Sequence, residues 1–181
     1  MKHKFQIFIL LLAGILTSSC IKEKLENTYN NQEDKIDKYI ESNLSKNENY
    51  SIVYNGGSAR LITKEGEGEE LKANGTVALY YAGYVFKTGL DKNSLFATNH
   101  ATSASESGWT LTDEDDDIMI IDLSEADLIP GLANGLVGVK AGEECQILFS
   151  GKYGFGKRAL GTVPANSALI YKIWVESISN E

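Results

Sequence analysis

The stretch from Leu128 to Glu144, "LIPGLANGLVGVKAGEE", is apolar enough to be buried, yet it contains four glycines. Pro130 suits the first turn of a helix, where its missing N–H removes no intrahelical hydrogen bond. Glycine inside a helix is unfavourable by up to about 1 kcal/mol relative to alanine. We therefore expect Gly135 and Gly138 to belong to a short helix whose backbone lies very close to a sheet. The residues expected on its packed face are Leu132, Leu136 and Val139.

Segments with alternating apolar residues lie on both sides of this helix, as expected for strands that bury one face. The expected strands are "YSIVY" (50–54), "ARLIT" (59–63), "TVALYYAGYVF" (76–86), "DDIMIIDL" (116–123), "CQILF" (145–149) and "ALIYKIWVESI" (168–178). The first two flank "NGGS", which is typical of a hairpin turn. Cys145 falls on the apolar face of its strand, so we expect a core residue there and no reactive thiol. The sequence thus predicts an α+β fold, in which an antiparallel sheet of four to six strands packs on one short helix.

The segment 97–117, "ATNHATSASESGWTLTDEDDD", is polar and ends in five consecutive acidic residues. A calcium-binding loop needs alternating ligands, a turn glycine and a distal glutamate, and this segment lacks that pattern. We expect a solvent-exposed insertion loop without a metal site. His100 has no histidine or cysteine nearby in the sequence, so no role is assigned to it.

The first 19 residues form a basic start followed by an apolar run of ten residues, Ile7–Leu16, and then small polar residues. The run is too short to span a bilayer as a mature helix, and the arrangement is typical of a secretory signal peptide. The cysteine after "LTSS", Cys20, resembles the lipidated cysteine in the lipobox of bacterial lipoproteins. The usual leucine three residues before the cysteine is Thr17 here. The resemblance implies a lipid at Cys20 that attaches the protein to a membrane; secretion with simple cleavage is the alternative.

Residues 20–49 form a polar tether in which apolar residues recur at helical spacing. We expect an amphipathic helix over about residues 31–45. Such a helix could dock on the domain, dock on a second copy or remain a loosely held tether. The remaining segment, 50–181, is expected to be one domain.

The formal net charge of the chain is −8 at pH 7, and it becomes −10 without the signal segment, which holds Lys2 and Lys4 but no acid. An acidic chain does not favour nucleic acid or anionic lipid surfaces. We therefore expect no nucleic-acid partner, and membrane contact only through the lipid. The oligomeric state stays open.

Three ordered motifs carry a family resemblance. "LIPGLANGLVGVKAGEECQILFSGKYGFG" (128–156), "VALYYAG" (77–83) and "TVPANSALIYKIWVESI" (162–178) resemble the signature of the FKBP family of peptidyl-prolyl isomerases in order and spacing. The match runs over about residues 68–178, and the insertion after Phe96 is longer than the family core needs. The resemblance implies an antiparallel half-barrel wrapped on a short helix, with a shallow apolar pocket for a proline side chain.

The resemblance also implies which residues line that pocket. The expected catalytic set is Tyr81, Phe96, Ile129, Leu132, Phe155 and Tyr171, and the expected additional substrate contacts are Leu128 and Val163. In the family, the backbone N–H that corresponds to that of Ile129 donates to a carbonyl of the ligand. No cofactor, metal, nucleophile or titrating group is implied, because an apolar pocket favours the twisted, less dipolar amide.

Four positions depart from the family pattern. Leu132 stands where the family has a tryptophan floor, Ala97 where it has an acid, Phe155 where it has a tyrosine hydroxyl donor, and Tyr171 where it has phenylalanine. Two functions therefore compete. One is a prolyl isomerase in the cell envelope, at the periplasmic face or the outer membrane, which assists the folding of exported proteins. The other is a non-catalytic module that holds polypeptides in the same groove or at the acidic insertion.

Overall fold

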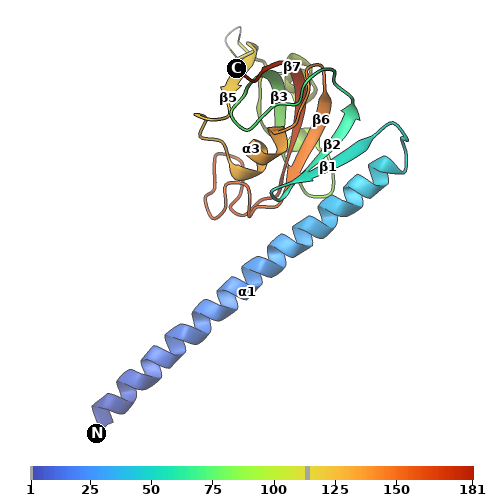
Figure 1. Ribbon diagram of the computed structural model, residues 1–181. Coiled ribbons are helices and arrows are strands. Elements are labelled where there is room, and N and C mark those ends of the chain that lie inside the picture. Colours follow the sequence, from blue (N-terminus) through green and yellow to red (C-terminus); the bar gives the residue numbers. More distant parts are fainter. Residues whose placement is uncertain (1, 113–114) are drawn as a thin grey trace.

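The computed structural model describes residues 2–112 and 115–181, with side chains described from residue 22 onward. The helices and strands in chain order are α1 (Lys2–Leu44), β1 (Ser51–Asn55), β2 (Ser58–Lys64), β3 (Thr76–Val85), the 3-10 turn η1 (Lys92–Ser94), β4 (Leu95–Thr98), α2 (Ala101–Glu106), β5 (Met119–Asp122), α3 (Pro130–Leu136), β6 (Glu144–Phe149) and β7 (Leu169–Ser179). The fold predicted from the sequence, an antiparallel sheet with one short helix across it, is confirmed (Figure 1).

The strands form one antiparallel sheet in the order β1-β2-β6-β7-β3-β4, and β5 pairs with β3. All six strands expected from the sequence are present, and β4 is an additional one. The hairpin between β1 and β2 turns at Gly56 and Gly57, whose φ angles are 56° and 88°. Two consecutive residues with positive φ match the twist of flanking strands, and glycine adopts such angles without strain.

The short helix α3 begins with Pro130 at its first turn, as predicted, and lies directly against the sheet. A side chain at Gly135 would meet Cγ2 of Ile147 at 2.2 Å, and one at Gly131 would meet the ring of Phe149 at the same distance. The close approach expected for Gly135 is therefore confirmed. The expectation for Gly138 was wrong: it lies beyond the helix with a φ of +86°, so it is required by the turn and not by contact with the sheet.

The two faces of the sheet carry two separate apolar clusters. The face toward α3 is packed with Ile62, Leu71, Val77, Leu79, Ile121, Leu136, Val139, Cys145, Ile147, Phe149, Val163, Leu169, Tyr171, Ile173 and Val175. The opposite face is packed with Ile36, Ile40, Ala59, Leu61, Ala82, Tyr84, Phe86, Leu95, Leu148, Ala168 and Ile170. Consecutive residues of β7 alternate between these clusters, as the period of two predicts. Cys145 is buried in the first cluster, which confirms its expected place in the core.

Helix α1 covers the second face of the sheet with its C-terminal part (Figure 1). Ile36 and Ile40 are almost fully buried there, and the Tyr39 hydroxyl donates to the Gln146 side chain at 2.8 Å. The Tyr29 hydroxyl donates to Asn166 at 2.8 Å. Among the three alternatives for this helix, docking on the domain is thus the one observed. The expected start near residue 31 was wrong, because the backbone is helical from Lys2.

The side chains of the signal segment and of Cys20 lie outside the described part, so lipidation at Cys20 stays a prediction. Among the residues that were described, no helix is both long enough and apolar enough to cross a membrane.

The insertion interrupts an edge strand. Strands β4 and β5 both pair antiparallel with β3, β4 with its residues 82–84 and β5 with residues 76–79. They therefore lie end to end along one edge of β3. The expectation of a loop over 97–117 was wrong in part, since this segment begins within β4 and contains helix α2.

His100 has a structural role that the sequence did not indicate. Its ring accepts a hydrogen bond from the Ser103 N–H at the start of α2 and stacks on Trp174, with ring centroids 3.8 Å apart.

Candidate functional site

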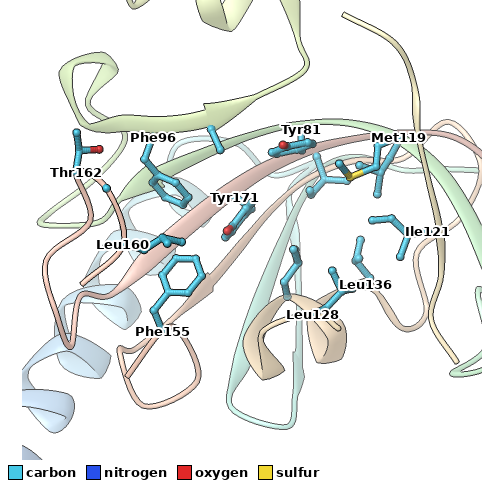
Figure 2. A pocket seen from close by; sticks show the side chains of 15 residues that line it. Tyr81, Phe96, Met119, Ile121, Leu128, Leu136, Phe155, Leu160, Thr162 and Tyr171 are labelled. Atoms are coloured by element: carbon cyan, nitrogen blue, oxygen red, sulfur yellow. The ribbon is translucent and has the colours of Figure 1, made fainter. Parts of the chain in front are cut away.

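An open cavity of about 430 Å³ lies between α3, the concave face of the sheet and the loop after β6. Its lining is Leu79, Tyr81, Phe96, Ala97, Met119, Ile121, Leu128, Leu132, Leu136, Phe155, Leu160, Gly161, Thr162, Tyr171 and Ile173. Figure 2 shows Phe96, Phe155 and Leu160 at one end, and Met119 and Ile121 at the other. The volume falls within the range of small-ligand sites, about 300–1,000 Å³, and the lining is mostly apolar.

Six of the eight residues expected from the sequence line this one cavity: Tyr81, Phe96, Leu128, Leu132, Phe155 and Tyr171. The structure places the other two elsewhere. Val163 is buried in the core, where it pairs through two backbone hydrogen bonds with Leu160, and Leu160 faces the cavity instead. Ile129 is the residue that precedes α3, and its half-buried side chain packs against the core.

The walls of the cavity are held by contacts among aromatic rings. The ring of Tyr171 meets Phe96 edge to face, with centroids 5.7 Å apart and planes at 88°. Phe96 meets Phe155 in the same manner at 6.2 Å and 77°, and Tyr171 also stacks on Phe149 at 6.0 Å. Such pairs each contribute about 0.5–1.5 kcal/mol beyond simple burial. The three strands and the loop that carry these rings are thereby fixed relative to one another.

Gly83 explains how two of these rings come together. It lies opposite Tyr171 in the pairing of β3 with β7. A side chain at Gly83 would meet Cζ of Phe96 at 2.8 Å and Cε1 of Tyr171 at 2.9 Å. The glycine two residues after Tyr81 therefore leaves the space that both rings occupy, which gives a physical reason for that part of the motif.

The polar groups of the lining are few, and they stay neutral near pH 7. Burial raises the pKa of Tyr171 strongly, and burial and then the negative charge of Asp115 raise the pKa of Tyr81. Both phenols therefore stay protonated at neutral pH and can donate hydrogen bonds. Among the residues described, no three His, Cys, Asp or Glu side chains are grouped to hold a metal ion. The cavity is suited to apolar binding and to hydrogen bonds from neutral donors.

Several lining residues were not expected from the sequence. Met119 and Ile121 come from β5, where four apolar residues in a row, 118–121, hide the alternation that identifies a buried face. Leu160 and Thr162 come from the loop before β7, in which nothing periodic marks the inward residues. Met119 and Leu160 are 40% and 55% exposed, so both form the rim of the cavity.

A buried ion pair fixes the helix that forms the floor. Arg60 of β2 donates to the carbonyl oxygens of Gly135, Val137 and Gly138 at 3.2, 2.9 and 3.0 Å, which satisfies acceptors at the C-terminal end of α3. Its Nε lies 3.4 Å from a carboxylate oxygen of Glu143, and both side chains are nearly inaccessible. Burial raises the pKa of Glu143, and Arg60 acts in the opposite direction. This pair holds the end of α3 nearest Leu136.

The fold and the cavity together define a class of protein: an antiparallel sheet wrapped on a short helix, with an aromatic, apolar cavity between them. A family model described as "FKBP-type peptidyl-prolyl cis-trans isomerase" matches residues 67–176. The chain belongs to this family, and the resemblance in the three motifs is confirmed.

Two similar proteins agree with this assignment. The chain is 23% identical to "FK506-binding protein 1" of Aspergillus oryzae over 117 residues, 65% of this chain and 94% of the relative. It is 29% identical over 125 residues to the FKBP-type peptidyl-prolyl cis-trans isomerase FkpA of Buchnera aphidicola, 68% of this chain and 42% of that relative. The chain thus spans less than half of the Buchnera protein.

Two solved structures share the fold. The crystal structure of FkpA from Escherichia coli superposes with a TM-score of 0.54 at 20% identity, covering 94% of this chain and 70% of that one. The three FKBP domains of wheat FKBP73 give a TM-score of 0.57 at 21% identity, covering 72% of this chain and 51% of that one. At these identities the likeness concerns the fold alone.

Proposed function

We propose that the chain is a prolyl isomerase that works on exported polypeptides through its apolar cavity. The observation that carries this proposal is the convergence of Tyr81, Phe96, Phe155 and Tyr171 on one cavity from three strands and a loop. The size of the cavity suits a proline ring together with its neighbouring residue.

The mechanism needs only differential binding. Rotation about a peptide bond faces a barrier of about 18–20 kcal/mol because the planar amide is stabilised by resonance. The twisted amide has lost that resonance and is less dipolar, so an apolar environment destabilises it less than it destabilises the planar form. A cavity that holds the proline ring while the preceding carbonyl turns therefore lowers the barrier.

Two groups could orient the substrate in this mechanism. The backbone N–H of Ile129 has no acceptor in the hydrogen bonds of the described residues, and it is the donor that the family resemblance assigns to a ligand carbonyl. The phenols of Tyr81 and Tyr171 are the second source of donors. Neither group has to change its protonation state.

Two lining residues support the competing function, a module that binds polypeptides without isomerising them. Leu132 and Ala97 both face the cavity, at the positions of the family's tryptophan and acid. A leucine floor keeps the cavity apolar but is smaller than tryptophan, and an alanine supplies no polar anchor. An exchange experiment on short X-Pro peptides separates the two functions, because tight binding with no acceleration of exchange favours the module.

The place of action that we propose is the cell envelope. The apolar run before Cys20 supports export, and the Buchnera relative bears the name of FkpA. Attachment through a lipid at Cys20 is the finer proposal. Replacing Cys20 with serine should move the protein from the membrane fraction to the soluble fraction while its unfolding midpoint stays the same. A serine variant that stays with the membranes would contradict lipid attachment.

A further inference from the structure

The edge of the sheet beside the cavity is open. Strand β5 pairs with β3 along one edge, and its other edge pairs with no strand in the described part of the chain. Met119 and Ile121 of β5 line the cavity, while Ile118 and Ile120 are exposed. Ile120 is 70% exposed. Free strand edges with exposed apolar residues favour association, and folded proteins generally avoid or cover them.

The side chain of Asn99 joins the segment before β5 to strand β3 beside the cavity. Its amide oxygen accepts from the Tyr81 N–H at 2.6 Å, and its amide nitrogen donates to the Asp117 carbonyl at 3.0 Å and to the Leu79 carbonyl at 3.3 Å. Asn99 is 5% exposed. It therefore fastens the segment just before β5 to the strand that carries Tyr81 in the cavity wall.

The segment fastened in this way is acidic. Asp115, Asp116 and Asp117 are all exposed, and no basic side chain forms an ion pair with them among the described residues. The carboxylate of Asp115 accepts from Thr112 at 2.6 Å and closes a turn. The negative charge of Asp115 raises the pKa of Tyr81 in the cavity wall, and Asp116 lines a neighbouring hollow with Tyr80 and His100.

We infer that the edge of β5 and residues 115–117 form an extended subsite for the client polypeptide, an inference that rests on the proposed isomerase function. The occupant is an extended segment with a proline in the cavity, an apolar residue against Ile120 and one or two lysines or arginines beside the three aspartates. An extended chain pairs with an open strand edge through its backbone. Residues 115–117 precede Met119 of the cavity lining by two to four positions, so the basic residues should lie about two to five positions from the proline.

The test compares turnover of matched peptides. One is a neutral tetrapeptide with a Leu-Pro bond; the others extend it by four residues that include two lysines or two glutamates, at either end. The wild-type protein should turn over one lysine peptide about 2- to 10-fold faster, in kcat/KM, than its glutamate counterpart, as expected for one or two exposed ion pairs. The preference should fall as salt is raised.

Two variants locate the effect. Asp116→Asn combined with Asp117→Asn leaves the Asp115 turn intact and should remove the lysine preference. Ile120→Ser should lower kcat/KM for extended peptides about 3- to 10-fold relative to the tetrapeptide, through lost apolar contact. The controls are Glu23→Gln with Glu26→Gln on α1, and Val53→Ser on the distant edge strand β1, where Val53 is 40% exposed. Neither control should change the ratios.

The outcomes are distinguishable. Equal turnover of lysine and glutamate peptides by the wild type overturns the subsite. If no peptide is turned over at all, the isomerase function fails, and fluorescence anisotropy of the same labelled peptides tests the subsite alone: a lysine preference in binding supports it. Sedimentation showing a dimer that Ile120→Ser dissociates, together with no lysine preference, would assign the edge to a second copy of the chain.

Discussion

Phe155 lies against Phe96 with ring centroids 6.2 Å apart and planes at 77°, so the loop after β6 is fastened to the edge strand β4 across the cavity. The family resemblance puts a tyrosine hydroxyl at Phe155. Phe155→Tyr should keep the ring contact and add a donor for the substrate carbonyl. We expect kcat/KM to rise about 2- to 10-fold, which corresponds to one hydrogen bond of about 0.5–1.5 kcal/mol. Turnover of a Leu-Pro peptide measures this, and a Phe155→Leu control should lower it. A tyrosine variant no faster than wild type would mean that the missing hydroxyl is not limiting.

Gly135 and Gly138 are needed for different physical reasons. Gly135→Leu should destabilise the domain by about 1–3 kcal/mol, because the new side chain would collide with Ile147 and push α3 off the sheet. Gly138→Ala should also destabilise, through its φ of +86°, although the space near it is less tight. Urea unfolding gives both values, and Gly68→Ala, with positive φ and open surroundings, is the control for backbone strain alone. A Gly135→Leu midpoint equal to that of wild type would contradict the close approach.

The buried pair of Arg60 and Glu143 should matter far more for stability than the exposed pair that Lys64, also on β2, forms with Glu144. Arg60→Met should cost about 3–5 kcal/mol, because it leaves the buried carboxyl group of Glu143 without its partner and three carbonyl oxygens without a donor. Lys64→Met breaks an exposed pair with Glu144 and should change stability by less than about 1 kcal/mol. Chemical unfolding of both variants tests the contrast. Equal small losses would show that Arg60 does not hold α3.

The pH dependence of turnover and of stability follows from the tyrosines of the cavity. Their pKa values are raised, so the neutral phenols persist above the ordinary value of 10. Turnover should therefore be nearly constant from about pH 6 to pH 9. Above pH 10 the unfolded chain ionises its tyrosines before the folded one does, so the unfolded state binds fewer protons and stability should fall as pH rises. Stopped-flow turnover and urea unfolding across this range check both statements; a bell-shaped profile between pH 6 and 9 would indicate a titrating catalytic group.

Much of the site could be predicted from the sequence because successive residues of its main strands point alternately to the two faces of the sheet. Tyr81 and Tyr171 fall on the inward face by a period of two, and the structure puts both in the cavity wall. The orientation of Val163 could not be predicted in this way. In the irregular loop before β7 nothing periodic distinguishes it from Leu160, and a local backbone turn decides which of them faces the cavity.

The structure of the insertion at 97–117 could be predicted even less from the sequence, because it depends on tertiary contacts. Helix α2 has only six residues, and His100 at its start is held by stacking on Trp174, a residue 74 positions away in the sequence. Only the C-terminal part of helix α1 could be predicted, because apolar residues recur at helical spacing only there and the composition changes near residue 20. The backbone continues as one helix through both.

Isomerisation in this cavity is tested most directly by the rate of cis-trans exchange in a Leu-Pro peptide, measured by NMR with wild type and with Phe96→Ala. Phe96 contacts both Tyr171 and Phe155, so its removal opens the cavity to water. Leu90→Ala, at an exposed residue outside the cavity, is the control, and unfolding midpoints confirm that each variant is folded. We predict clear acceleration by wild type and by Leu90→Ala, and a loss of at least about tenfold with Phe96→Ala, since about 1.4 kcal/mol of lost transition-state contact has that effect. Rates with wild type and Phe96→Ala that both equal the uncatalysed rate would contradict isomerisation in this cavity.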